Sequence, residues 1–173
     1  SKIKNLIHDL ENDYFDYGTA GEGEFSFVKL VEAIIEKDEN KLMKVPGLVK
    51  RISYGKYHIN YNQSVHDLNT LPRPARHLVD MEAYFKIGAF HSAKSRSKRV
   101  LSVMCSRGCP EKCTFCSTPS MWGQNIRWRS TEHIMDEIET DVRDFKIGEI
   151  QFEDDTITVN KKNLFSLCDR LEK

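Results

Sequence analysis

Val100-Leu-Ser-Val-Met-Cys-Ser-Arg-Gly-Cys-Pro-Glu-Lys-Cys-Thr-Phe-Cys116 is the stretch that decides the fold of this chain. Val100 to Met104 form a short apolar run, which is typical of a buried β-strand. Four cysteines crowd the loop that follows: Cys105, Cys109, Cys113 and Cys116. Open α/β sheets bind ligands at the carboxyl ends of their strands. This stretch therefore predicts a strand and a binding site at its end.

The residues after the cysteine loop predict a helix and a second strand. Ser130 is a good N-cap for a helix that should end near Gly148. Its apolar residues recur at intervals of four, four and three: Ile134, Ile138, Val142 and Phe145. Glu149 to Glu153 then predict a strand, and Asn160 caps a further helix. The apolar side of that helix carries Leu164, Leu167, Cys168 and Leu171.

Strand, loop, helix, strand and helix in this order are typical of a parallel βαβ unit. The carboxyl ends of parallel strands meet at the same edge of a sheet. We therefore expect the cysteine loop and the acidic run Glu153-Asp154-Asp155 to face one pocket.

The first 80 residues predict a separate group of elements. Asp13 to Gly18 form a weak strand or turn, which leads through Gly21-Glu-Gly-Glu24 into a helix from Phe25 to Lys37. This order suggests the last unit of an α/β domain. The glycines either let the backbone approach a ligand closely or make a tight corner with no ligand.

A hairpin and a stiff connector follow. Leu48 to Tyr54 and Lys56 to Tyr61 predict two short strands around Gly55. Leu71-Pro-Arg-Pro-Ala75 cannot continue a helix or a central strand, so it is a candidate domain boundary. A short helix is expected around Leu78 to Phe85.

Composition narrows the class of protein. The chain has 173 residues with 26 basic and 26 acidic side chains, so its charge predicts no polyanionic partner. The basic run Ser92 to Arg99 lacks interleaved aromatics and fits a solvated loop better than a nucleic-acid surface. No apolar run approaches the roughly 20 residues of a membrane helix. We therefore expect a cytoplasmic protein without membrane or nucleic-acid partners, and its crowded cysteines fit reduced, metal-binding thiols.

The spacing of three cysteines points to an iron–sulfur cluster with one open iron. Cys109, Cys113 and Cys116 are separated by three and then two residues. Three thiolates leave one iron without a protein ligand, whereas a cluster closed by four cysteines usually only carries electrons. The alternatives are non-catalytic: structural zinc would need a second ligand pair. A closed cluster would need Cys105, whose direction is fixed by the strand that it ends.

Cys109, Cys113, Phe115 and Cys116 form a Cys-x-x-x-Cys-x-aromatic-Cys motif that resembles the signature of radical S-adenosylmethionine enzymes. The resemblance implies that the three cysteines bind a four-iron four-sulfur cluster and that S-adenosylmethionine chelates the fourth iron. Reductive cleavage then gives methionine and a 5′-deoxyadenosyl radical. The resemblance also places Phe115 beside the adenine.

The end of the second strand resembles the same family by location. In the wider family a Gly-Gly-Glu motif there binds the amino group of S-adenosylmethionine. This chain has Phe152-Glu-Asp154, which lacks the glycines. The resemblance therefore implies that Phe152, Glu153 and Asp154 lie at the S-adenosylmethionine site. Arg127 and Arg129 either contact an anionic group or remain surface residues.

Other segments resemble the subgroup of radical enzymes with an N-terminal cobalamin-binding domain. These are Ser106-Arg-Gly-Cys-Pro110, Arg127-Trp-Arg-Ser130, Gln151-Phe-Glu-Asp-Asp155, Gly21-Glu-Gly-Glu24 and Leu71-Pro-Arg-Pro-Ala75. The resemblance implies cobalamin near Gly21 and Gly23. No Asp-x-His-x-x-Gly motif for an axial histidine occurs, so a radical enzyme without cobalamin stays an alternative.

Together these features predict an α/β chain in three parts. Residues 1–40 would be the tail of a Rossmann-like cobalamin-binding domain, and 41–97 a linker with the hairpin and the proline-rich connector. Residues 98–173 would begin a partial TIM-type (β/α) barrel, whose complete form takes about 250 residues. Both ends of the chain look cut, because it lacks an initial methionine and stops within a helical pattern.

The resemblance implies methyl transfer, cyclisation or rearrangement of a small-molecule substrate. It also implies an electron donor such as a flavodoxin or ferredoxin. In this family selectivity lies largely in later parts of the barrel, so neither the substrate nor a catalytic residue is predicted.

Overall fold

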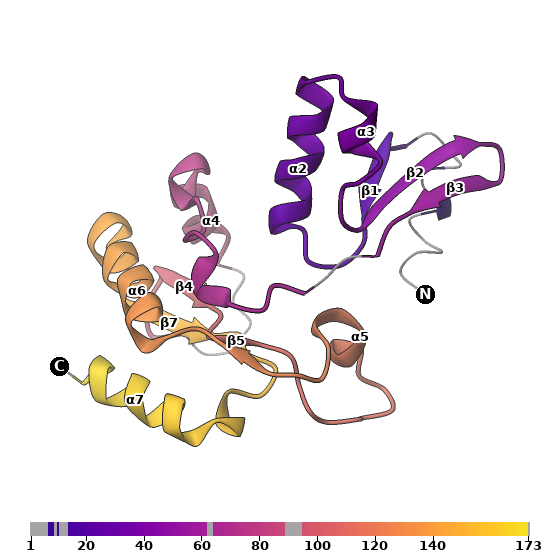
Figure 1. The fold of residues 1–173 in the computed structure, drawn as a ribbon. Helices are drawn as coiled ribbons and strands as arrows, with labels where there is room; N and C mark the ends of the chain where they lie inside the picture. Colours follow the sequence, from indigo (N-terminus) through magenta and orange to yellow (C-terminus); the bar gives the residue numbers. More distant parts are fainter. Residues whose placement is uncertain (1–6, 9, 11–13, 62–63, 89–94, 173) are drawn as a thin grey trace. The chain divides into compact units, whose positions relative to one another are not determined.

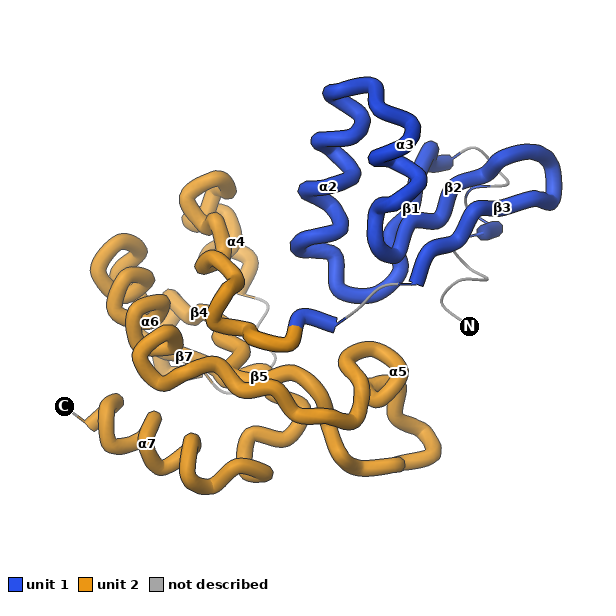
Figure 2. The backbone as a smooth tube through the Cα atoms, viewed as in Figure 1, with its two compact units in different colours: residues 1–65 blue, residues 66–173 orange. Residues whose placement is uncertain are grey.

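The computed structural model describes residues 7–8, 10, 14–61, 64–88 and 95–172, and it forms two compact units (Figure 2). The units are residues 1–65 and 66–173. The proline-rich connector Leu71–Ala75 thus belongs to the second unit, whereas the three expected domain ranges stay predictions. Asp13 and residues 92–94, which belong to an expected strand and loop, lie outside the described residues. In the described ranges no helix has the length and apolar character to cross a membrane.

The first unit contains a three-stranded antiparallel sheet with helices before its hairpin (Figure 1). Its elements are β1 (Tyr17–Thr19), α2 (Glu24–Ile35), α3 (Glu39–Leu42), β2 (Leu48–Ser53) and β3 (Lys56–Ile59). The predicted hairpin is confirmed, with Gly55 in the left-handed conformation (φ +68°) at its turn. β1 pairs with β2 in antiparallel fashion, so the described strands of this unit show no parallel Rossmann-like sheet.

Helix α2 packs by a different face from the one its apolar residues mark. Its buried residues are Ser26, Leu30 and Ala33, and the last two pack with Leu42, Val45 and Leu48. The expected apolar positions are exposed: Phe27, Val28, Val31, Ile34 and Ile35. The helical period was therefore predicted correctly, but α2 packs mainly on α3 and buries a different face from the one that its apolar pattern marks.

The second unit is built on two parallel strands. Its helices and strands are α4 (Met81–Ile87), β4 (Val100–Val103), β5 (Ser106–Arg107), α5 (Thr118–Trp122), β6 (Arg127–Trp128), α6 (Thr131–Phe145), β7 (Glu149–Phe152) and α7 (Lys161–Leu171). Short 3-10 turns lie at Leu68–Thr70, Arg76–Leu78 and Ile157–Val159. β4 and β7 pair in parallel from Val100↔Glu149 to Val103↔Phe152, which confirms the predicted βαβ unit.

The predicted helix caps are present. The Ser130 side chain accepts a hydrogen bond from the His133 amide (3.1 Å), and Asn160 accepts one from the Asn163 amide (3.2 Å). Helices α6 and α7 bury Ile134, Ile138 and Leu167 against Val103 and Cys105 (Figure 1). This core fixes the strand that leads into the cysteine loop.

Three details of these helices correct the sequence expectations. Helix α6 was expected to end near Gly148 but ends at Phe145. Lys146, and not a glycine, takes the left-handed conformation (φ 55°) that closes the helix. Gly148 instead allows close packing, because a Cβ there would lie 2.5 Å from Ser97 Oγ. Val142 and Cys168 are exposed, so the buried sides of α6 and α7 are narrower than their apolar patterns indicate.

Candidate functional site

The cysteine loop is closed at its base by a small antiparallel ribbon. Strands β5 and β6 pair through Ser106↔Trp128 and Arg107↔Arg127. The Cys109 amide donates to the Gly123 carbonyl (3.3 Å). Gly108 has φ +100°, and a Cβ there would lie 2.4 Å from the Asn125 carbonyl oxygen. A side chain at position 108 would therefore open the base of the loop.

The three thiols of the motif lie on this closed loop. All are free; Cys109 is buried, whereas Cys113 and Cys116 are exposed. The Thr118 side chain and backbone amide both hydrogen-bond to the Cys116 sulfur and lower the pKa of that thiol. A lower pKa favours the thiolate, which is the form that binds metals.

In the described part of the chain these thiols are not gathered around one point. Among the residues that the structure describes, no three His, Cys, Asp or Glu side chains converge on a position for one metal ion. A mononuclear zinc site needs such convergence. In an iron–sulfur cluster each thiolate binds a different iron, so the sulfurs need not point at one position.

Cys105 lies in a different environment from the other three clustered cysteines. It is fully buried in the core of the second unit, beside Val103 and Ile134. Burial, reinforced by the negative charge of Asp154, raises the pKa of its thiol well above the usual range. A protonated thiol is a poor ligand. Cys105 therefore packs as a small apolar side chain.

The acidic run after β7 divides into residues with different contacts. The Glu153 amide donates to the Val103 carbonyl (3.0 Å), and its carboxylate accepts from Ser102 Oγ (3.4 Å). Asp154 accepts from the Cys105 amide (3.0 Å) and from the Ser106 hydroxyl. Asp155 accepts from the Thr118 hydroxyl (2.8 Å). Strand β7 thus ends directly against the cysteine loop.

A cavity of about 270 Å³ lies beside the end of β4. Glu153, Met104 and Arg107 line it together with Leu68 and apolar residues of the connector: Leu71, Pro72 and Pro74. The cysteine loop and the acidic run were expected to face one pocket. Glu153 and the start of the loop do line this cavity, whereas Cys109, Cys113 and Cys116 do not. Phe115 is 91% exposed, and Phe152 packs against the core of the unit.

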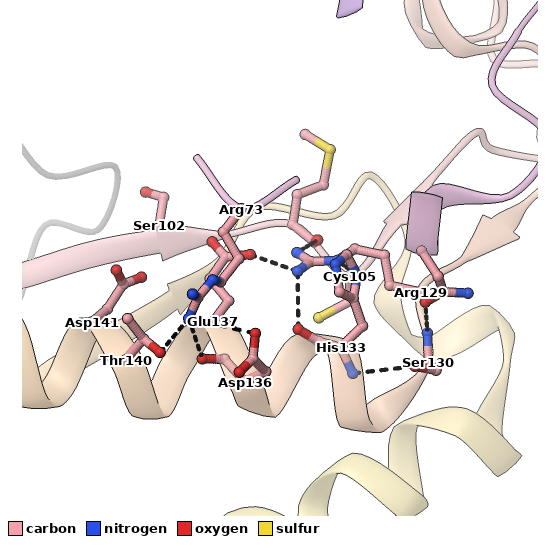
Figure 3. Close-up of polar contacts among 12 residues, drawn as sticks. Arg73, Ser102, Cys105, Arg129, Ser130, His133, Asp136, Glu137, Thr140 and Asp141 are labelled. Carbon is pink, nitrogen blue, oxygen red and sulfur yellow. Dashed lines mark hydrogen bonds and ion pairs between the residues drawn. The ribbon is translucent and has the colours of Figure 1, made fainter. Parts of the chain in front are cut away.

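A buried carboxylate on α6 joins residues that follow the connector to residues that follow the cysteine loop (Figure 3). Glu137 on α6 is only 2% exposed and binds Arg76 (2.9 Å) and Arg129 (2.6 Å). Arg76 also pairs with Asp141 (2.9 Å), and burial raises the pKa of this carboxyl although the charge of Arg76 opposes the shift. Arg129 is therefore no surface residue, and the carboxylate that it contacts belongs to this chain.

The same two arginines cover the free edge of β4. Arg76 Nη2 donates to the Ser102 carbonyl (3.0 Å), and Arg129 Nη1 donates to the Met104 carbonyl (2.9 Å). The Val103 carbonyl accepts from Glu153 of the neighbouring strand end. Successive carbonyls of a strand point to opposite sides, so both arginines bind the side that faces away from β7.

The predicted cobalamin turn lies in the first unit. Gly21 has φ +97°, which favours glycine. Gly23 is the N-cap of α2, and a Cβ there would meet nothing within 4 Å. Glu22 between them is buried and accepts from the Val65 amide (3.2 Å). The backbone at Gly23 is therefore open enough for a ligand to approach.

Comparison with known proteins identifies relatives along most of the chain. No protein-family model matches it. A cytidylyl-2-hydroxyethylphosphonate methyltransferase from Streptomyces wedmorensis is 40% identical over 92 residues, which are 53% of this chain and 17% of that protein. An uncharacterized methyltransferase from Pyrococcus horikoshii is 30% identical over 88% of this chain and 31% of its own length. An anaerobic magnesium-protoporphyrin IX monomethyl ester cyclase from Rubrivivax gelatinosus is 29% identical over 94% of this chain and 28% of its own length.

Solved structures share the fold. The radical S-adenosylmethionine methyltransferase TsrM from Kitasatospora setae matches 94% of this chain and 31% of its own (TM-score 0.67, 18% identity). The cobalamin-dependent S-adenosylmethionine radical enzyme OxsB matches 96% of this chain and 23% of its own (TM-score 0.68, 22% identity). This chain is related to the cobalamin-dependent radical S-adenosylmethionine enzymes. It spans about a third or less of the length of these relatives.

Several residues around the cysteine loop were not predicted as parts of the site. Glu137 lies three positions after Ile134, so a charged residue beside the apolar stripe of α6 was the available signal. Arg76 directly follows the connector motif. Thr118 donates to Asp155, and Thr156 Oγ1 lies 3.3 Å from Cys109 Sγ. Neither threonine has a signal in the sequence, because these contacts span 37 and 47 residues.

Proposed function

We propose that the protein containing this chain is a radical S-adenosylmethionine enzyme in which Cys109, Cys113 and Cys116 bind a four-iron four-sulfur cluster. The supporting observation is the sorting of four neighbouring cysteines, three on a closed loop and Cys105 protonated in the core. Three ligands leave one iron of a cluster open. The same sorting speaks against a closed four-cysteine cluster.

S-adenosylmethionine would bind where the cysteine loop and the end of β7 meet. Glu153 faces the cavity beside β4 and is the carboxylate best placed for the amino group. Phe152 and Asp154 define the position by their neighbouring location, and exposed Phe115 is available for the adenine. The bound cluster and S-adenosylmethionine supply, after one-electron reduction, methionine and a 5′-deoxyadenosyl radical.

The remaining parts of the proposal follow the family. The second unit would begin a partial (β/α) barrel, with residues 98–173 as its first two strand–helix units. Residues 1–40 would end a cobalamin-binding domain, with Gly21 and Gly23 beside the cofactor, and residues 41–97 would link the two. The reaction would be methyl transfer, cyclisation or rearrangement of a small molecule in the cytoplasm, with electrons from a flavodoxin or ferredoxin.

Anaerobic reconstitution of the full-length protein with iron and sulfide tests this proposal. We expect about four irons and four sulfides per polypeptide, and 5′-deoxyadenosine on addition of S-adenosylmethionine and a reductant. A reconstituted cluster that gives no 5′-deoxyadenosine under reducing conditions would contradict the enzymatic assignment.

Single substitutions separate the proposal from a non-catalytic metal module. Cys109→Ala, Cys113→Ala and Cys116→Ala should each lose the cluster, because each removes a ligand. Cys105→Ala should keep it, since the Cys105 thiol is buried and protonated. Loss of iron from a folded Cys105→Ala protein would favour the closed four-cysteine site instead.

A further inference from the structure

Three consecutive residues after β7 each contact a different point of the cysteine loop. Asp154 accepts from the Cys105 amide and the Ser106 hydroxyl, where the loop begins. Thr156 Oγ1 lies 3.3 Å from Cys109 Sγ, at the first thiol of the motif. Asp155 accepts from the Thr118 hydroxyl (2.8 Å), directly after the last thiol. The segment 154–156 therefore contacts the start, the middle and the end of the loop.

These contacts leave Asp154 little freedom for another partner. Its two carboxylate oxygens are each bound by a donor of the chain, the Cys105 amide at Oδ2 and the Ser106 hydroxyl at Oδ1. A charged acceptor strengthens such hydrogen bonds relative to neutral ones. Glu153, by contrast, lines the cavity beside β4. Asp154 thus binds the cysteine loop, whereas Glu153 faces the cavity.

Thr156 and Asp155 act on the thiols themselves. Cys109 is 8% exposed and has its sulfur against the Thr156 hydroxyl. Thr118, whose hydroxyl donates to Asp155, places its backbone amide against the Cys116 sulfur. Both contacts connect β7 to thiols that are separated from it by tens of residues in sequence.

We propose that Asp154, Asp155 and Thr156 are positioning residues that hold the cysteine loop in its cluster-binding arrangement before the cluster is present. The inference rests on the proposed function and deepens it, since it assigns Asp154 to the loop and leaves Glu153 for S-adenosylmethionine. A loop held in place in advance loses less conformational freedom when it binds a ligand.

The first test uses the metal-free full-length protein. Thr156→Val removes the hydroxyl at Cys109 and keeps the shape of the side chain. We expect alkylation of Cys109 by iodoacetamide to become about 3- to 10-fold faster, the range that corresponds to one lost hydrogen bond. Mass spectrometry of the loop peptide measures it, with Cys113 as the internal reference.

Two matched variants control this experiment. Thr156→Ser keeps the hydroxyl and should alkylate like the wild-type protein. Thr158→Val makes the same change at an exposed threonine two residues further on and should have no effect. Equal Cys109 alkylation in Thr156→Val and Thr158→Val would overturn the role of Thr156.

Hydrogen exchange tests Asp154 in the same metal-free protein. Asp154→Asn presents an NH₂ group to one of its two donors, so we expect the Cys105 amide to exchange at least about tenfold faster. Asp169→Asn on the exposed side of α7 is the matched control and should leave this amide unchanged. An unchanged Cys105 amide in Asp154→Asn would show that the carboxylate does not hold the loop.

Cluster assembly completes the test. Asp154→Asn and Thr156→Val should take up iron and sulfide more slowly than the wild-type protein and the two controls, at least about threefold under limiting iron. Equal assembly rates would overturn the functional part of the inference. If the wild-type protein assembled no cluster, the proposed function would fail while the alkylation and exchange results would still decide whether segment 154–156 holds the loop.

Discussion

Cys116 and Cys105 show how a single chain gives different chemistry to thiols only 11 residues apart. Thr118 stabilises the thiolate of Cys116 through its side chain and its backbone amide. Burial and the charge of Asp154 stabilise the protonated thiol of Cys105. The suitability of each thiol as a metal ligand therefore depends on the neighbours of its sulfur, and the count of cysteines alone does not decide it.

Thr118→Val should reveal this control of Cys116. The lowered pKa means that the thiolate, and with it the alkylation rate of Cys116, appears at lower pH than for an ordinary thiol. Removal of the hydroxyl should move the midpoint of the pH–rate curve upward and slow alkylation of Cys116 several-fold at neutral pH. The metal-free protein is used, and mass spectrometry resolves the site. A pH–rate curve that matches that of the wild-type protein would contradict the role of Thr118.

Gly108 and Gly123 separate two costs of a side chain in the cysteine loop: a steric clash of the Cβ and backbone strain. Both have positive φ, so alanine is strained at either position. Only at Gly108 would the Cβ also meet a backbone atom, the Asn125 carbonyl oxygen at 2.4 Å. We expect Gly108→Ala to lower the free energy of unfolding by about 1–3 kcal/mol more than Gly123→Ala. Urea unfolding of the two variants measures the difference, and equal midpoints would contradict it.

At the scale of elements, the sequence predicted those features that depend on residues close together in the chain. Ser130, Asn160 and the apolar spacing of α6 located helices and strands of the second unit, because caps and periodicity act within a few residues. The covering of the free edge of β4 by Arg76 and Arg129 was not predictable. It depends on a carboxylate on α6 and a connector that lie 61 residues apart in sequence.

Glu137→Gln tests that arrangement. Glu137 is buried and neutralises two arginines, so its removal leaves two guanidinium groups without their shared carboxylate. We expect a loss of about 3–5 kcal/mol in the free energy of unfolding. Glu139→Gln, two residues further on the exposed side of α6, should lose at most about 0.5 kcal/mol. Urea unfolding midpoints compare them, and a similar effect of both variants would show that the buried network contributes little.

At the scale of the whole molecule, the chain divides its predicted chemistry between two units. The cysteine loop, β7 and the cavity belong to residues 66–173, whereas Gly21 and Gly23 belong to residues 1–65. The family resemblance had placed the glycine turn and the cysteine loop in different parts of the chain. It did not predict the antiparallel pairing of β1 with β2, which joins residues about 30 positions apart, nor the exposure of Phe27 and Val31 on α2.

The division predicts that the two cofactors can be lost independently. Gly23 has ordinary backbone angles (φ −88°, ψ −15°), and a Cβ there would meet nothing within 4 Å, so Gly23→Thr should not disturb the fold. Threonine is also accepted at helix N-caps. A branched side chain would, however, block a cofactor that approaches this backbone. We expect Gly23→Thr to weaken cobalamin retention about tenfold, or ~1.4 kcal/mol, and Gly23→Ser to weaken it less.

Iron and sulfide should stay at the wild-type level in both Gly23 variants, because the proposed cluster ligands lie in the other unit. Cobalamin absorbance and iron content of the same full-length samples measure the two cofactors together. Full cobalamin retention in a folded Gly23→Thr protein would exclude this turn as the cobalamin site. A wild-type protein that assembles the cluster and cleaves S-adenosylmethionine but takes up no cobalamin would instead support the radical enzyme without cobalamin, since the chemistry of Cys109, Cys113 and Cys116 does not require the first unit to bind it.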